Sequence, residues 1–200
     1  MSLATLLDRN KAFAATGDVA KNPQIPIIPH QQAYIITCVD PRTEPAAILG
    51  VDLGDAIVHR VIGGRVTSDV VRDIAYISYL HETKTPDADW FEIAVIHHTD
   101  CGSTFLADPA VREGFAARGY NEADLAWLPA TDPAATVRAD VTTLLRSPQI
   151  SSNIQISGYV YNTAEGTLDT VVQPTTLRPP LASSIADTRT SFSRSLTTSA

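Results

Sequence analysis

Apolar stretches that read as buried strands alternate with helical patterns through the middle of the chain, and this alternation limits the possible folds. The strand-like stretches are QAYIITCVD at 32–40, DAIVHRVIGG at 55–64 and WFEIAVIHHTD at 90–100. Segments 67–83 and 132–147 carry apolar residues at helical spacing, and 43–50 predicts a short helix. We therefore expect an α/β fold with a mostly parallel central sheet of about four strands and helices on both faces.

The remaining segments fit around one such sheet. Residues 153–172 alternate like a strand, turn at TAEG and return, which predicts a terminal strand and hairpin. With 200 residues and 44% hydrophobic content, one domain over 1–200 is expected. We divide it into an N-terminal helical arm at 1–29, a core at 30–172 and a C-terminal extension at 173–200. The extension, rich in Ser, Thr and Pro, is expected either to clasp another subunit or to be partly disordered.

Charge and hydropathy exclude several classes of function. Asp and Glu number 22 against 15 Lys and Arg, a formal charge of −7, and the basic residues do not cluster. We expect no nucleic-acid partner. No apolar run approaches the roughly 20 residues that cross a bilayer, and the N-terminus carries charges too early for a signal peptide. We therefore expect no membrane association and an intracellular, cytoplasmic location.

Chemically reactive side chains gather at the ends of two predicted strands. Cys38 ends the first strand and is followed by Asp40 and Arg42, which alternate with it and so leave the strand on one side. His98 and Cys101 follow the third strand. Since sites in parallel sheets form beyond the carboxyl ends of the strands, we expect the two segments to meet.

The residue types favour a zinc site. Cys38, His98 and Cys101 make a Cys2His set, which suits tetrahedral Zn²⁺ and leaves a fourth position open, as in catalytic sites. A carboxylate near the metal could fill that position or accept a hydrogen bond from water, with Arg42 orienting Asp40. Each residue alone has an ordinary alternative: a core or redox-active cysteine, a buried histidine, or a structural ion pair.

The other histidines are expected to play no part in the chemistry. His59 fits a satisfied histidine within the second strand, and His30 and His81 are expected to be solvated. His97 points away from His98 by strand alternation and is expected to be structural, with a supporting role behind the metal as an alternative.

The two motifs together resemble those of a known family. CVDPR, followed about sixty residues later by HHTDCG, is similar to the C-x-D-x-R and H-x-x-C motifs of the β-class carbonic anhydrases. The likeness covers roughly residues 30–172. It implies that Cys38, His98 and Cys101 bind one Zn²⁺ per subunit, that Asp40 and Arg42 form a gating pair, and that the chain assembles into a homodimer or homotetramer.

The resemblance also implies a reaction. Zinc lowers the pKa of bound water to about 7, for which carbonic anhydrase is the standard illustration, so that hydroxide can attack a small linear electrophile. We expect a zinc lyase for reversible CO2 hydration to bicarbonate. The alternatives are a carbonyl sulfide hydrolase that produces H2S and CO2, and a non-catalytic zinc or redox protein. The hydrolase stays open because HRVIGGRV differs from the Arg-Asn-Ala-Gly segment of many members. The expected pocket walls are Ile62, Val66, Phe105 and Leu106.

Overall fold

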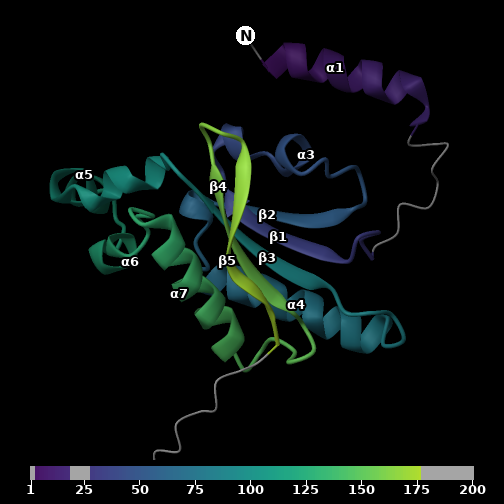
Figure 1. The fold of residues 1–200 in the computed structure, drawn as a ribbon. Coiled ribbons are helices and arrows are strands. Elements are labelled where there is room, and N and C mark those ends of the chain that lie inside the picture. Colours follow the sequence, from purple (N-terminus) through teal and green to yellow (C-terminus); the bar gives the residue numbers. More distant parts are fainter. Residues whose placement is uncertain (1–2, 19–27, 177–200) are drawn as a thin grey trace, which may run out of the picture.

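The computed structural model describes residues 3–18 and 28–176. Its strands are β1 (Ala33–Cys38), β2 (Ala56–Val61), β3 (Glu92–His98), β4 (Ile156–Asn162) and β5 (Thr167–Thr175). Its α-helices are α1 (Leu3–Thr16), α3 (Pro45–Ile48), α4 (Ser68–Lys84), α5 (Pro109–Ala116), α6 (Glu122–Ala126) and α7 (Pro133–Arg146). Short 3-10 turns are η1 (Pro41–Thr43), η2 (Ile62–Gly64) and η3 (Gly102–Ala107). Figure 1 shows the elements around one central sheet.

The sheet has the order β2-β1-β3-β4-β5. The first four strands are parallel, and β5 pairs antiparallel with β4 through the predicted hairpin. The prediction of an α/β fold with a mostly parallel sheet and a terminal hairpin is confirmed. Because β1 and β3 are neighbours, their carboxyl ends lie side by side at one edge of the sheet.

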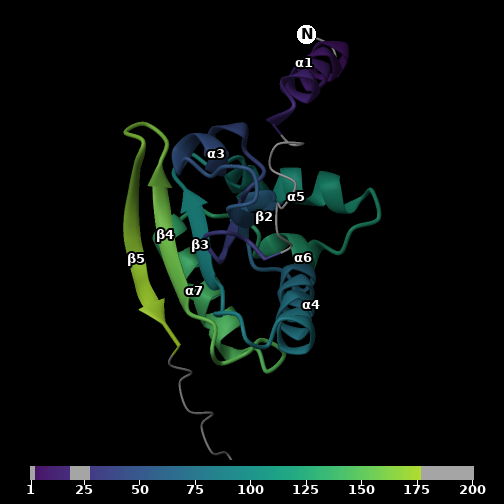
Figure 2. The ribbon, with the colours of Figure 1, turned by 90° about the vertical axis from the view of Figure 1, so that its right-hand side faces the viewer.

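Helices α4 and α7 pack on the same face of the sheet (Figure 2). Val70 of α4 and Val137 of α7 share one buried apolar cluster with Ile36 and Val95, which are partners on that face. In the sheet, β2 lies on one side of β1, whereas β3 and β4 lie on the other side. The connection from β1 to β2 therefore runs in the opposite direction from the connections β2 to β3 and β3 to β4. A right-handed crossover therefore places the connection that contains α3 on the other face.

The ends of these helices follow from local chemistry. The Asp132 side chain accepts a hydrogen bond from the Ala135 N–H, and Pro133 opens α7, as the sequence predicts. Thr67 caps α4 in the same way by accepting from the Val70 N–H. The helix predicted over 43–50 is shorter than expected, since Asp40 first caps the separate turn η1.

Helix α1 lies apart from the sheet in Figure 1. All its side chains are exposed, among them the apolar Leu3, Leu6, Leu7 and Phe13. The predicted arm at 1–29 is therefore described only in part. The extension at 173–200 lies outside the described residues beyond position 176.

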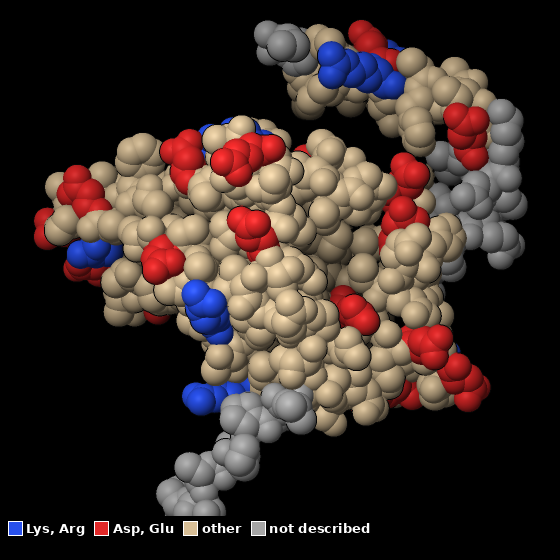
Figure 3. All heavy atoms as spheres, in the orientation of Figure 1, with Lys and Arg blue, Asp and Glu red and all other residues tan. Residues whose placement is uncertain are grey.

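Most of the face shown in Figure 3 carries no charged side chain, and acidic side chains cover more of it than basic ones. Within residues 3–18 and 28–176, no helix is both long enough and apolar enough to span a bilayer.

Candidate metal centre

The strand ends bring together the three predicted metal ligands. Cys38 is the last residue of β1, His98 is the last of β3, and Cys101 follows at the start of η3. Their ligand atoms all lie within 4.8 Å of one another, and the two sulfurs are 3.9 Å apart. All three side chains are buried. The predicted meeting of the two segments is confirmed.

The hydrogen bonding of His98 leaves one nitrogen available. Its Nδ1 lies 2.9 Å from the Thr99 main-chain oxygen, and since a carbonyl only accepts, Nδ1 carries the proton. Nε2 then holds a lone pair, is buried, and has no hydrogen-bond partner among the described residues. A buried acceptor without a partner costs free energy unless a cation or donor meets it. The residues therefore fit a metal ion bound at Nε2.

The hydrogen bond between the two cysteine side chains changes the pKa of both thiols. Hydrogen bonding to Cys101 raises the pKa of Cys38, and burial raises it further. The same hydrogen bond lowers the pKa of Cys101, which becomes the thiolate of the pair. Burial alone would lower the pKa of His98, but the neighbouring Cys101 thiolate outweighs it and the pKa is raised overall. A divalent cation would stabilise both thiolates and neutral imidazole at once.

The glycine pair of η2 lets three chain segments approach closely. Gly63 and Gly64 both have φ of +68°. A Cβ on Gly64 would lie 3.0 Å from the Ile96 oxygen and 3.3 Å from the Cys38 nitrogen. Only glycine combines this conformation with the space between β1 and β3.

Asp40 and Arg42 form a tight pair beside the cluster. Both carboxylate oxygens of Asp40 accept from the guanidinium, at 3.0 and 2.7 Å, and Oδ1 also accepts from the Arg42 N–H. These hydrogen bonds lower the pKa of Asp40 to about 2. In this arrangement the Asp40 carboxylate faces Arg42 and is not among the three clustered ligand groups.

Two further residues support this loop and were missed by the sequence analysis. Arg42 also donates to the carboxylate and the main-chain oxygen of Asp100, which joins the two loops. Arg60 of β2 donates to the main-chain oxygens of Cys38 and Asp40 and pairs with Glu44. The alternation of β2 gives no sign that Arg60 reaches over to the neighbouring strand.

A buried polar network lies behind the site. Asp140 of α7 accepts from the Arg65 guanidinium at 2.8 and 3.1 Å and lies 3.2 Å from His97 Nε2. His97 Nδ1 lies 2.8 Å from the Thr136 hydroxyl. His97 thus anchors β3 to α7 on the face away from His98, as strand alternation predicts.

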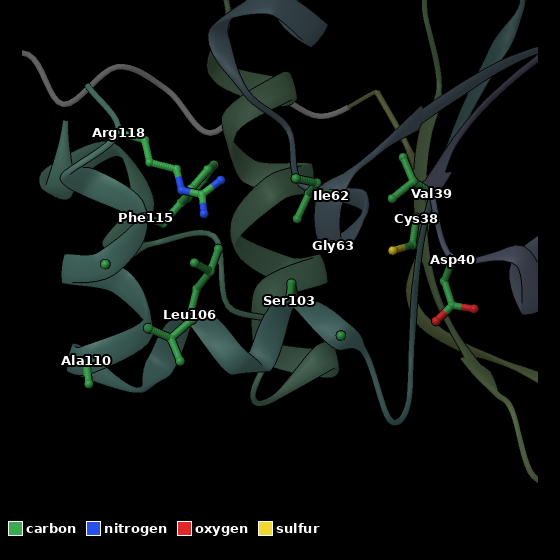
Figure 4. Close-up of a pocket in the computed structure, with 13 residues that line it drawn as sticks. Cys38, Val39, Asp40, Ile62, Gly63, Ser103, Leu106, Ala110, Phe115 and Arg118 are labelled. Atoms are coloured by element: carbon green, nitrogen blue, oxygen red, sulfur yellow. The ribbon is translucent and has the colours of Figure 1, made fainter. Parts of the chain in front are cut away.

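A cavity of about 670 Å³ opens beside the cluster. Figure 4 shows Cys38 and Asp40 on one side, with Phe115 and Arg118 across the cavity. Its lining is largely apolar and includes the predicted wall residues Ile62 and Leu106 together with Val39, Ala110, Val111 and Phe115.

Three expectations about single residues were wrong. Val66 packs into the main core, and Phe105 points to solvent with 72% exposure, so neither lines the cavity. His81 is 7% exposed and packs against Trp90 with the ring centroids 4.2 Å apart, although its polar surroundings in the sequence indicated solvation. Each position depends on contacts between elements that local sequence does not reveal.

Known proteins resemble this chain in sequence and in architecture. Residues 33–124 match the family model described as carbonic anhydrase. β-Carbonic anhydrase 1 of Mycobacterium tuberculosis is 31% identical over 150 residues, which span 74% of this chain and 86% of that protein. The chain belongs to the β-carbonic anhydrase family. A carbonic anhydrase structure from Streptococcus mutans superposes with a TM-score of 0.67 at 33% identity, covering 86% of this chain and 99% of the other.

The family also contains relatives of this chain with a different activity in their name. Carbon disulfide hydrolase of an Acidianus species is 26% identical over 156 residues, covering 66% of this chain and 73% of that protein. The relatives of this chain therefore include proteins named carbonic anhydrase and proteins named carbon disulfide hydrolase.

Proposed function

We propose that the protein is a zinc lyase that hydrates CO2 reversibly to bicarbonate, with one Zn²⁺ per subunit held by Cys38, His98 and Cys101. The observation that carries the proposal is the buried cluster at the ends of β1 and β3, made of two sulfurs and an imidazole nitrogen that has no hydrogen-bond partner among the described residues. Two thiolates and one neutral imidazole match the charge of Zn²⁺ and leave one position open to substrate. Zinc, when bound, would lower the pKa of a coordinated water to about 7.

Residues of the chain orient the Asp40 carboxylate and line the substrate cavity. Asp40 remains charged at neutral pH because Arg42 lowers its pKa, so it can accept a hydrogen bond but cannot donate one. Arg42 fixes the direction of that carboxylate through two hydrogen bonds from its guanidinium. The largely apolar walls offer an uncharged surface to an uncharged linear substrate. We assign Asp40 and Arg42 as the catalytic pair that controls access to the metal.

A homodimer or homotetramer is part of this proposal. The cavity is far larger than a three-atom substrate requires, and α1 exposes Leu3, Leu6, Leu7 and Phe13. A helix that leaves these apolar side chains exposed within the described part of the chain is suited to pack on a second copy. Sedimentation of the full chain and of a chain lacking residues 1–18 would test whether this arm supports assembly.

Hydrolysis of carbonyl sulfide is the second candidate. It is favoured by the apolar cavity and by the likeness to carbon disulfide hydrolase, because carbonyl sulfide is another linear, weakly polar electrophile. Water adds to its carbon, and the products are CO2 and H2S. The same metal ligands and the same Asp40 would serve both reactions, so the choice depends on the cavity walls.

One comparison of rates tests both candidates. On a single zinc-loaded preparation, kcat/KM is measured for CO2 from proton release and for carbonyl sulfide from H2S release. We expect the CO2 value to be far the greater. A far greater carbonyl sulfide value would establish the hydrolase instead, and two rates equal to buffer would refute both.

A variant at Asp40 tests the non-catalytic alternative. Asp40→Ala is expected to keep one zinc per chain and to lose most turnover, by roughly 100-fold or more. A zinc storage or redox protein has no use for this carboxylate. Unchanged metal-dependent turnover in the variant would contradict the assigned role.

A further inference from the structure

The Ser103 side chain lies directly behind one of the proposed metal ligands. Ser103 belongs to η3, two residues after Cys101, and is 5% exposed. Its Oγ lies 3.2 Å from Cys101 Sγ. The resemblance between the sequence motifs gives no role to this position.

The direction of that contact follows from a second hydrogen bond. The Ala130 N–H donates to Ser103 Oγ at 3.1 Å, so the oxygen already accepts from the main chain. The hydroxyl proton is then available to the sulfur. A metal-bound cysteine is a thiolate and has no proton to donate, which leaves Ser103 as the donor.

The surrounding backbone keeps the hydroxyl in place. A Cβ on Gly63 would lie 3.0 Å from Ser103 Oγ, 3.1 Å from Arg65 Cγ and 3.2 Å from the Leu128 oxygen, so the space beside the hydroxyl is tightly packed. Arg65 holds the same loop by donating to the Trp127 oxygen and stacking over its ring. The hydroxyl is therefore held between a fixed N–H and the sulfur.

We propose that Ser103 is a positioning residue that donates a hydrogen bond to the Cys101 thiolate and thereby weakens the electron donation of that sulfur to the bound metal. The inference rests on the proposed zinc site. Two thiolates make Zn²⁺ a poorer Lewis acid than three imidazoles would, and a hydrogen bond that draws charge from one sulfur partly restores the acidity. Fixing the sulfur also favours metal binding.

Cobalt substitution reports on this bond without relying on turnover. The full-length protein is loaded with Co²⁺ in place of zinc, and its sulfur-to-cobalt charge-transfer absorption is recorded. Ser103→Ala should move this band to longer wavelength, because a thiolate without the hydrogen bond gives up its electron more readily. Chelator competition should show a zinc affinity lower by roughly 10- to 100-fold. Ser103→Gly removes the same hydroxyl and should act alike.

Thr104→Val is the matched control. The Thr104 hydroxyl donates to the Cys101 main-chain oxygen at 2.7 Å in the same turn, whereas the side-chain hydrogen bonds to the Cys101 sulfur come from Cys38 and Ser103. Its removal should loosen the turn and leave the charge-transfer band in place. A band that moves equally in Thr104→Val would show that general loosening causes the shift.

The outcomes separate this inference from the proposed function. Folded Ser103→Ala and Ser103→Gly proteins that bind Co²⁺ with the wild-type band would overturn the role of Ser103 and leave the zinc proposal intact. A wild-type chain that binds neither Co²⁺ nor Zn²⁺ would overturn both. A shift in both Ser103 variants, absent from the control, would establish the hydrogen bond to the thiolate.

Discussion

The Arg42 guanidinium binds Asp100 at two atoms, the carboxylate at 2.7 Å and the main-chain oxygen at 2.9 Å. The same side chain holds Asp40, so one cation connects the loops that follow β1 and β3. The main-chain contact survives any substitution at position 100. The orientation of Asp40 therefore depends on Arg42 far more than on the exposed Asp100 carboxylate.

The first prediction concerns that difference. Arg42→Lys should lower kcat/KM for CO2 by roughly 10- to 100-fold with zinc content unchanged, because an ammonium group cannot reproduce the planar fork. Asp100→Asn removes only a carboxylate that is 80% exposed and should cost less than about fivefold. Equal losses in the two variants would contradict the assigned order of importance.

Removing the metal should affect both activity and the two cysteines. Dialysis against a zinc chelator is expected to abolish turnover and lower the unfolding temperature, since a ligand bound only by the folded state stabilises it. Cys38 and Cys101 should then become open to alkylation, as coordinated thiolates are protected. Peptide mass spectrometry before and after zinc is restored measures the protection, and identical labelling in both states would argue against thiolate ligation.

Asp140 should be among the most costly residues to neutralise. Asp140→Asn leaves the buried Arg65 cation without its carboxylate partner and should destabilise the fold by about 3–5 kcal/mol in urea unfolding. The control Asp69→Asn breaks an exposed pair with Arg72 and should cost no more than about 1 kcal/mol.

Asp140 is also expected to make the free energy of unfolding depend on pH. Burial alone would raise the pKa of Asp140, but hydrogen bonds from His97 and Arg65 outweigh it and the pKa is lowered. The folded state then binds this proton less readily than the unfolded state. The stabilisation is present above the ordinary Asp pKa of about 3.9 and is lost as the pH falls below it. Asp140→Asn should flatten the stability curve in this acid range, and a curve of unchanged slope would speak against the assignment.

Packing at Gly158 gives a test of the core. A Cβ there would lie 2.4 Å from Val137 Cγ1 and 3.1 Å from Val141 Cγ2, so Gly158→Ala should push β4 and α7 apart at a cost of about 1–3 kcal/mol. Gly114→Ala, in the exposed part of α5, meets nothing within 4 Å and should stabilise by up to about 1 kcal/mol. Thermal unfolding of both variants distinguishes a crowded interface from a general intolerance of alanine.

The Cys38, His98 and Cys101 cluster could be predicted because each contributing segment is recognisable from its own short stretch of sequence. Cys38 ends one apolar run and His98 ends another, and parallel strands place such ends at one edge. The packing of α4 and α7 on one face could not be predicted in this way, because it depends on the order of the strands in the sheet. The spacing of apolar residues does not determine that order. Arg60 and Ser103 were missed because each acts on a partner brought near only by folding, as when Arg60 reaches the Cys38 oxygen.

Arg60 holds the loop after β1 through the main-chain oxygens of Cys38 and Asp40, and its side-chain partner there is Glu44. The two main-chain hydrogen bonds do not involve the side chain of Val39, which lies between these residues. Val39 is 52% exposed and lines the cavity, while its own N–H is held by the Val61 oxygen. Substitutions at position 39 are therefore expected to leave the main chain of this loop in place. They offer a way to change the substrate preference without moving the Cys38 sulfur or the Asp40 carboxylate.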